Sequence, residues 1–419
     1  MRIDSKLIRD TVNERIYTAI FVFAGFLYFP TIYNSFNEVI QKIDMPWPIA
    51  ELLINYEGGF VRRGLLGQVA LWISRGLNVP YLRFYAIIFM IATLINFCNL
   101  YYLLGDYKKR YLPIVLMVVL GPSLLMFPVY DVLAYFRKEI LFVSVLLTHA
   151  SILKLLLAEK IAERSYRLFC ICVLSPALVL CLLLHELQIF LIPAHLCLTV
   201  IAFSYRKTLR WSVFLCYVIP VAAFLLVVQF SGTELIAQKI LQSWDLQSGQ
   251  GTAIEAIGWT MQRSINLSLQ IFSDSNSVQQ YALGWVLAVI VPSVALGCTI
   301  YTRCGSRINL ALLIGVLVVA ALSTLPLYYI GWDYGRWISI TSWSSVSVAL
   351  AFPMTLKIGC SSITSSKPRF SLIATSLAIF YVATFALPHC CFLQNVFKSG
   401  LFLACKNSLS FLFHTLFAA

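Results

Sequence analysis

The chain has 419 residues, of which 60% are hydrophobic and only 12% are charged, and its mean hydropathy is +0.84. Soluble globular proteins carry about 25% charged residues, so this composition excludes that class and predicts an all-α, polytopic membrane protein. The net charge of +13 does not indicate a nucleic-acid partner, because the basic residues fall in short groups between apolar segments.

The predicted elements are apolar segments of roughly 17 to 25 residues, the length that a helix needs to cross the hydrocarbon core. About eleven transmembrane helices are expected, at 16–33, 82–104, 111–129, 139–157, 168–186, 188–204, 211–231, 282–301, 309–330, 337–356 and 370–388. They form one polytopic membrane domain over residues 1–388. The tail, 389–419, is predicted to be an amphipathic helix or an additional membrane segment.

The distribution of Lys and Arg predicts the orientation of these spans. Most of the basic residues lie in the N-terminal head and in the loops on the same side of the membrane, so the positive-inside rule makes the N-terminus cytoplasmic. In a bacterium the protein would be a multi-pass protein of the inner membrane. Two longer loops, about 34–81 and 232–281, are then expected in the periplasm, and the second is polar and long enough to cover a site.

The first of these loops contains a motif that combines charge with glycine, Tyr56-Glu-Gly-Gly-Phe-Val-Arg-Arg-Gly-Leu-Leu-Gly67. Glycines allow tight turns and close approach to a ligand, and the guanidiniums of Arg62 and Arg63 suit phosphate oxygens. Glu57 is placed to accept a proton beside them. The simpler alternative is an ordinary turn whose arginines contact lipid headgroups.

Three further polar groups fall in short turns on the same predicted side of the membrane. They are Arg137, Lys138 and Glu139 after the third span, His185 and Glu186 after the fifth, and Trp332, Asp333, Arg336 and Trp337 after the ninth. Basic residues in short periplasmic turns run against the positive-inside rule, which indicates an anionic ligand. Taken singly, each group also fits a local ion pair, a polar hairpin or an aromatic belt.

Together the four groups supply the parts of a glycosyl-transfer site on a lipid-linked phosphate. The arginines, with Lys138, would neutralise the phosphates, and Glu57, or else His185 with Glu186, would activate an acceptor hydroxyl. Glu139 and Asp333 would orient substrate or arginine, and Trp332 and Trp337 would stack on sugars. No cofactor is expected and no metal site is predicted, because arginines can take the place of a metal here and no two histidines have a metal-binding spacing. His149, His195, His389 and His414 are expected to be packing or interfacial residues.

The phrases Glu57-Gly-Gly-Phe-Val-Arg-Arg-Gly-Leu-Leu-Gly67, Arg137-Lys-Glu139, His185-Glu186 and Asp333-Tyr-Gly-Arg-Trp337 resemble those of bacterial inner-membrane O-antigen and capsule repeat-unit polymerases. The resemblance implies periplasmic joining of polyprenyl-(pyro)phosphate-linked glycans, with a chain-length regulator or a flippase as further partners. The long first loop carrying Glu57 also resembles GT-C fold glycosyltransferases, which transfer single sugars from a lipid phosphate, but it has no Asp-Asp, Asp-Glu or Asp-x-Asp pattern. A non-catalytic polysaccharide transporter or scaffold is the remaining alternative.

Overall fold

The computed structural model describes residues 5–41, 45–108, 111–131, 134–304, 310–331, 333–352, 369–387, 396–397 and 400–417. The chain is all-helical, with 79% helix and no strand within these ranges. The prediction of an all-α fold is therefore confirmed.

Seven helical segments of the described chain are long and apolar enough to cross a membrane. They are formed by α1 (Ser5–Gln41); α4 (Tyr81–Leu103) with η1 (Leu104–Asp106); α7 (Glu139–Leu157); α8 (Glu163–Phe169), η3 (Cys170–Leu174) and α9 (Ser175–Leu184); η4 (Glu186–Leu191) and α10 (Ile192–Tyr205); α15 (Ser275–Trp285), η7 (Val286–Ile290) and α16 (Val291–Cys304); and α17 (Leu310–Leu322) with α18 (Leu325–Ile330). Each of the seven falls on an expected span, which supports a helical membrane protein.

The other four expected spans contain shorter helices. These are α5 (Leu112–Val119) and α6 (Phe127–Tyr130); η5 (Trp211–Tyr217) and α11 (Val218–Val227); α19 (Tyr334–Leu350); and α20 (Arg369–Thr384). The segment 111–129 is not one continuous helix, because α5 ends at Val119 and the chain turns before α6. Pro122 favours this break, since a proline ring inside a helix clashes with the carbonyl four residues earlier.

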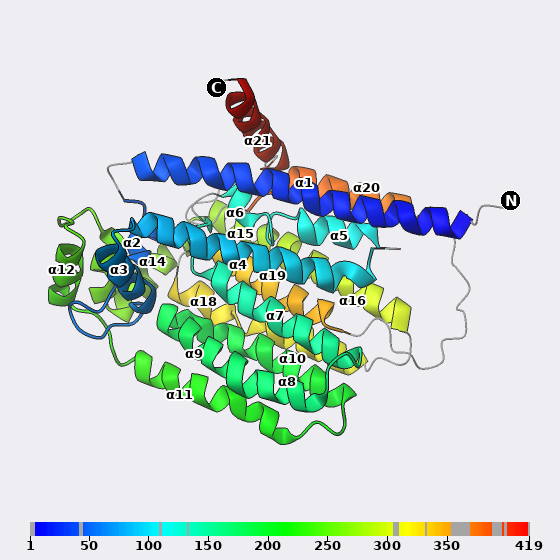
Figure 1. The fold of residues 1–419 in the computed structure, drawn as a ribbon, viewed down its shortest axis with the longest axis horizontal. Helices are drawn as coiled ribbons and strands as arrows, with labels where there is room; N and C mark the ends of the chain where they lie inside the picture. The colour runs from blue at the N-terminus through cyan, green and yellow to red at the C-terminus, as the bar shows by residue number, and fades with distance from the viewer. Residues whose placement is uncertain are drawn as a thin grey trace.

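The helix α19 lies at the centre of the bundle and packs against α7, α10, α16 and α17. Every residue of α19 is buried, so it is surrounded by protein rather than lipid. Serine and threonine occupy many of its positions, and small hydroxyl side chains let neighbouring helices approach closely. In Figure 1, α1 and α20 run along one side of the bundle and α11 runs along the opposite side.

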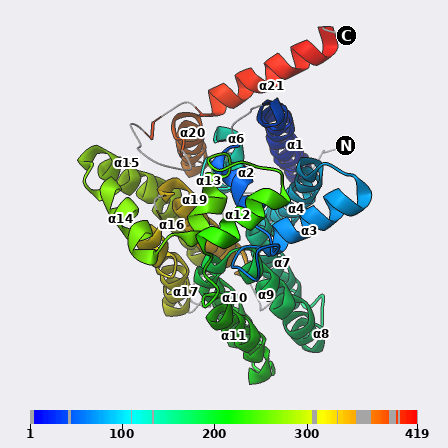
Figure 2. The ribbon, with the colours of Figure 1, turned by 90° about the vertical axis from the view of Figure 1, so that its left-hand side faces the viewer.

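The two expected outer loops fold as short helices at one end of the molecule (Figure 1, left, and Figure 2, facing the viewer). The first loop contains α2 (Trp47–Leu52) and α3 (Leu65–Leu77), and the second contains α12 (Glu234–Ser243), α13 (Thr252–Glu255), η6 (Ala256–Gly258) and α14 (Met261–Phe272). Hydrogen bonds join them, from Asn55 Nδ2 to Ser243 Oγ (2.8 Å) and from Trp244 Nε1 to the carbonyl of Leu53 (2.8 Å). The second loop therefore covers part of the first.

The tail ends in the helix α21 (Gly400–Phe417), which projects away from the bundle (Figures 1 and 2). It packs against α1, α6 and α20. Several of its apolar side chains are exposed, including Phe402, Leu409 and Phe413. The tail is thus helical over 400–417, while 389–395 and His389 lie outside the described residues, as do the side-chain surroundings of His414.

Candidate functional site

The structure brings the predicted polar groups together in one buried assembly at the end of the bundle that carries the outer loops. We call it the charged cluster: Glu51, Arg62, Arg63, Arg137, Lys138, Glu139, His185, Glu186, Asp333 and Arg336. Nine of these ten residues are predicted from the sequence, and Glu51 is an addition. Trp332 lies outside the described residues.

Glu186 is held by the two arginines of the first loop. Arg63 donates to its carboxylate through Nε (2.9 Å) and Nη2 (2.6 Å), while Nη1 of Arg62 lies 3.4 Å from it. Arg63 has a φ of 69°, a left-handed conformation that is unusual for a side-chain-bearing residue. The bidentate pair with Glu186 helps to hold the backbone in this conformation and fixes the direction of the guanidinium.

Glu51 lies at the centre of the charged cluster and was not predicted. It accepts a hydrogen bond from Nη1 of Arg137 (2.8 Å), and its other oxygen lies 3.3 Å from His185 Nε2 and 3.6 Å from Arg63 Nη1. Burial raises the pKa of a carboxyl, but the hydrogen bond from His185 and the charges of Arg336 and Lys138 outweigh it, so the pKa of Glu51 is held well below its usual value. Glu51 is therefore a charged residue that links the segments carrying Arg63, Arg137 and His185.

Arg336 and Asp333 extend the charged cluster onto α19. Arg336 donates through Nη1 to Asp333 (2.9 Å) and through Nε and Nη2 to Glu139, with 2.7 Å for the Nε contact. Arg137 bridges the two halves, because its Nη2 lies 3.2 Å from Asp333 while its Nη1 binds Glu51. The guanidinium of Arg336 also lies over the ring of Trp337, 4.6 Å from its centroid. Trp337 is buried, so it supports Arg336 rather than presenting a free face to a sugar.

Lys138 joins the charged cluster through backbone carbonyls. Its ammonium donates to the carbonyls of Arg63 (3.2 Å) and Leu184 (3.0 Å), which ties the first loop to the end of α9. The side chain is almost fully buried, and this burial lowers the pKa of Lys138 to about 8 despite the opposing charge of Glu51. Lys138 is therefore mostly charged at pH 7 and loses its charge under mildly alkaline conditions.

His185 has both ring nitrogens engaged. Its Nδ1 accepts a hydrogen bond from the backbone N–H of Leu187 (3.2 Å), so in a neutral ring Nε2 carries the proton and faces Glu51 at 3.3 Å. Burial, and after it the charge of Arg63, lowers the pKa of His185, which keeps the ring neutral near pH 7. With no nitrogen left to take a proton, His185 serves as a positioning residue in this arrangement.

Three α-helices begin at the charged cluster. Gly64 precedes α3, Lys138 precedes α7 and Asp333 precedes α19. A helix N-terminus presents unpaired N–H groups and a partial positive charge of about half a unit. The five basic side chains also exceed the four carboxylates by one. The whole assembly is therefore electropositive, which favours an anion.

Only two members of the charged cluster reach the surface to a useful extent. The side chains of Arg62 and Arg63 are 22% and 25% exposed, whereas the other members are 12% exposed or less. An external ligand therefore meets this assembly at Arg62 and Arg63, which we call its mouth. Arg62 is the more available of the two, since its ion-pair partner within the described chain is Glu186 at 3.4 Å.

Glu57, the predicted base, lies outside the charged cluster. Its side chain is 36% exposed, accepts from Gln68 Nε2 (3.3 Å) and lies 3.6 Å from Nη1 of Arg75. It nevertheless shares the turn that carries Arg62 and Arg63. Because the carboxylates of the charged cluster are occupied by ion pairs, Glu57 is the predicted carboxylate that an acceptor can reach from outside.

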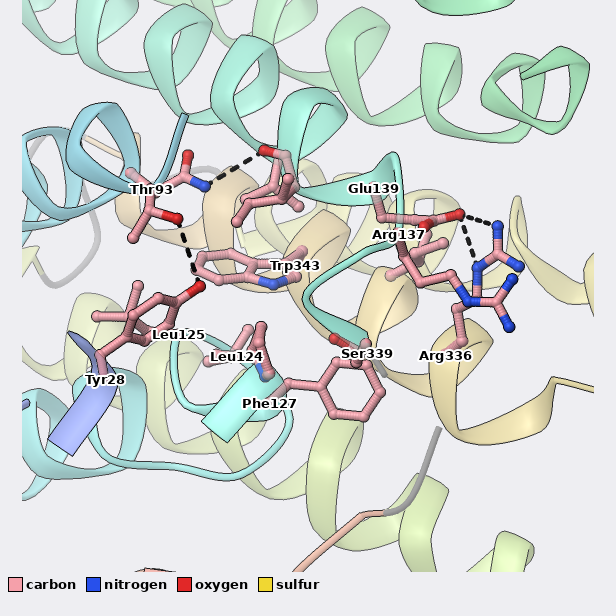
Figure 3. Close-up of a pocket in the computed structure, with 16 residues that line it drawn as sticks. Tyr28, Thr93, Leu124, Leu125, Phe127, Arg137, Glu139, Arg336, Ser339 and Trp343 are labelled. Atoms are coloured by element: carbon pink, nitrogen blue, oxygen red, sulfur yellow. Dashed lines mark hydrogen bonds and ion pairs between the residues drawn. The ribbon is translucent and has the colours of Figure 1, made fainter. Parts of the chain in front are cut away.

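A cavity of about 50 Å³ lies on the inner side of the charged cluster. Figure 3 shows Arg137, Glu139 and Arg336 on one side of this cavity and Tyr28 and Thr93 on the other. At 10–15 Å³ for each water molecule, the space suits about four waters, and typical ligand pockets exceed about 300 Å³. Sugar rings therefore do not fit in this cavity.

The cavity offers hydrogen bonds to the waters that would fill it. Arg137 Nε, Glu139 Oε2 and Asn96 Oδ1 belong to residues that line it, and these buried atoms have no hydrogen-bond partner among the described residues. One donor and two acceptors match what a small internal water cluster requires. The cavity therefore has the size and the polar groups to hold a small water cluster behind Arg137 and Arg336.

His149 and His195, which were expected to be packing residues, are buried within the spans and bonded to each other. Their Nδ1 atoms lie 3.1 Å apart, and Nε2 of His149 lies 2.9 Å from the hydroxyl of Tyr166. This polar pair joins α7, α8 and α10 away from the charged cluster. These contacts engage both ring nitrogens of His149, which would otherwise be unpaired in an apolar interior.

Comparison with known proteins supplies no role for the charged cluster. No known protein family, curated protein or solved structure matches this chain. The chemistry of the site is therefore argued from its own geometry.

Proposed function

We propose that this chain is a membrane glycosyltransferase that acts at the periplasmic face on polyprenyl-(pyro)phosphate-linked glycans in surface-polysaccharide synthesis, with repeat-unit polymerisation as its reaction. The observation that carries the proposal is an electropositive cluster with one excess positive charge, whose accessible mouth consists of two arginines. Guanidinium groups bind phosphate oxygens through paired hydrogen bonds, and preorganised donors stabilise the charge of a leaving phosphate.

In the proposed reaction, the mouth binds the donor and Glu57, in the same turn, accepts the proton of the acceptor. Arg62 and Arg63 bind the phosphate of the donor, while Glu51 and Glu186 hold Arg63 in place. The bond between the anomeric carbon and the phosphate oxygen breaks, and its electrons stay with the phosphate. The oxygen of the acceptor hydroxyl bonds to the anomeric carbon, and its proton passes to Glu57.

The topology belongs to the same proposal. About eleven spans, with η5–α11, α19 and α20 among them, would place the N-terminus in the cytoplasm of a bacterial cell and the mouth in the periplasm. The shorter helices η5–α11 and α20 have the apolar composition of spans. A flippase that delivers the lipid-linked glycan, and a chain-length regulator, are partners under this proposal.

Turnover by the purified protein tests the proposal. Full-length protein in detergent, given a polyprenyl-pyrophosphate-linked oligosaccharide, should form longer lipid-linked glycans and release polyprenyl pyrophosphate. Arg63→Ala should abolish the product, whereas Arg206→Ala, which removes an ion pair with Glu159 at the far end of the Glu186–Tyr205 segment, should not. Addition of one sugar, seen only when a polyprenyl-phosphate-linked monosaccharide is supplied as donor, would favour the GT-C type reaction instead. Complete absence of turnover by folded wild type would contradict transferase activity.

A further inference from the structure

An exposed aromatic surface borders the mouth of the charged cluster. The ring of Phe60 stacks on Tyr56 with centroids 5.1 Å apart, and it packs in a T-shaped arrangement with Phe230, with centroids 4.8 Å apart. Phe60 and Phe230 are 43% and 45% exposed, although both are fully apolar. We call these three residues the aromatic platform. Within it, Phe60 lies two positions before Arg62 along the chain.

The first loop is built to hold the aromatic platform in this position. Gly64 has no Cβ, and one added there would lie 2.3 Å from the ring of Tyr56, so the ring rests directly on the backbone next to Arg63. The backbone N–H of Arg62 donates to the carbonyl of Phe230 (3.1 Å). This bond ties the phosphate-binding turn to the segment that follows α11.

The aromatic platform continues an apolar outer surface. Phe230 follows α11, whose Val218, Leu225 and Leu226 are all more than half exposed. A helix of this composition is stable with such a surface only if lipid covers it. The path from α11 over Phe230 and Phe60 to Arg62 therefore runs from a lipid-facing surface to a cation.

We propose that the aromatic platform and Arg62 form the lateral entry site for an isoprenoid lipid phosphate, with its first isoprene units on Phe60 and Phe230 and its phosphate at Arg62. This inference rests on the proposed function and specifies that the substrate enters from the bilayer. A free phosphate shares the chemistry of the headgroup but contacts only the arginines. An isoprenoid chain also buries the exposed aromatic faces, which is favourable in proportion to the apolar area removed from water.

Binding of two probes to the purified full-length protein in detergent distinguishes a site for an isoprenoid lipid phosphate from a site for free phosphate. The probes are a long-chain polyprenyl phosphate and inorganic pyrophosphate, and the variants are Phe60→Ala, Phe230→Ala and Arg62→Gln. The matched control is Phe380→Ala, which removes a phenylalanine that is 64% exposed on α20, along the other side of the bundle (Figure 1).

Phe60→Ala and Phe230→Ala should each weaken polyprenyl phosphate binding by roughly five- to tenfold and leave pyrophosphate binding unchanged. Arg62→Gln should weaken both probes, and Phe380→Ala neither. Equal weakening of both probes by Phe60→Ala and Phe230→Ala, or no weakening of either, would overturn the entry site. Binding of pyrophosphate to wild type, weakened by Arg62→Gln, would still support the phosphate site. If wild type bound neither probe, the proposed function would fall as well.

Discussion

Glu51 is the residue on which the arrangement of the arginines depends. It is buried, and it lies within 3.6 Å of nitrogen atoms of Arg63, Arg137 and His185. Removing one partner from a buried ion pair leaves an uncompensated charge, which is more destabilising than removing an exposed pair. The role of Glu51 is thus to fix the direction of two guanidiniums that come from different segments.

Glu51→Gln should destabilise the fold and abolish transfer. The substitution keeps the size of the side chain but removes its charge, so Arg63 and Arg137 lose a counter-ion, at a cost of about 3–5 kcal/mol. The melting temperature of the detergent-solubilised protein reports this loss. Glu57→Gln is the control: its exposed pair contributes about 1 kcal/mol or less, so stability should be kept while turnover is lost. Equal melting temperatures for wild type and Glu51→Gln would show that Glu51 does not stabilise the arrangement of Arg63 and Arg137.

Lys138 should make stability depend on pH. Burial lowers the pKa of Lys138 to about 8, compared with about 10.4 for a free lysine. Between these values the unfolded chain binds more protons than the folded chain, so stability rises as the pH rises through this window. Below about pH 8 both states are protonated and the burial penalty is present in full.

The comparison of wild type with Lys138→Met isolates this effect. Between about pH 7.5 and pH 10, the free energy of unfolding of wild type should rise by up to about 3 kcal/mol relative to that of the variant. Lys207→Met, which removes an exposed lysine, is the control and should track wild type. If the free energies of unfolding of wild type and Lys138→Met differed by a constant amount over this range, Lys138 would have an ordinary pKa.

At the residue scale, the sequence predicts nine members of the charged cluster but does not indicate Glu51. Charges in short turns flanked by apolar spans indicate Arg137, His185 and Arg336, because such charges are unfavourable there without partners. Glu51 is missed because its apolar neighbours resemble an interfacial helix. The available signal is a lone carboxylate inside the apolar stretch from Trp47 to Tyr56. Glu57 is more conspicuous in the motif, yet it lies outside the assembly.

At the scale of elements, the position of α3 depends on one glycine. A Cβ on Gly67 would lie 2.1 Å from the carbonyl oxygen of Ile54, so the helix packs directly on the backbone that follows α2. This contact fixes the position of α3 relative to the loop that carries Arg62 and Arg63. In the same helix, a Cβ on Gly76 would have no atom within 4 Å.

Gly67→Ala and Gly76→Ala form a matched pair within α3. Gly67→Ala should lower stability by about 2 kcal/mol or more, because backbone must move to admit the methyl group. Gly76→Ala should leave stability unchanged or raise it by about 0.5–1 kcal/mol, since alanine favours the helix. The melting temperatures of the two variants check this. Similar values for both would show that α3 does not lie against Ile54.

Elements are predicted best where an apolar run is long and uninterrupted. The spans at α4, α7 and α10 are found from composition alone, since an uninterrupted apolar run of this length is typical of a membrane-spanning helix. The segment 111–129 is equally apolar, yet α5 ends at Val119. Gly121 and Pro122 are the local signal of this break, but the run contains no charged residue to end it. The full burial of α19 is also invisible in a hydropathy window.

At the scale of the molecule, the proposed orientation separates two sets of exposed residues. Ser248 lies in the second outer loop and Lys207 follows α10, and both are exposed. With the outer loops in the periplasm, Ser248→Cys should react with a membrane-impermeant thiol reagent in intact cells. Lys207→Cys should react only after the membrane is opened. Unsubstituted protein corrects for native cysteines. The reverse pattern would place the charged cluster in the cytoplasm and contradict the proposed reaction.

The glycan profile of cells is the most direct measurement of the central claim, that the charged cluster joins lipid-linked repeat units. A strain lacking this gene is compared on a gel with strains complemented by wild type and by Arg63→Ala. We expect deletion to leave a single repeat unit on the lipid anchor, wild type to restore a ladder, and Arg63→Ala to restore none. A ladder that persists after deletion, or that Arg63→Ala restores in full, would contradict the claim.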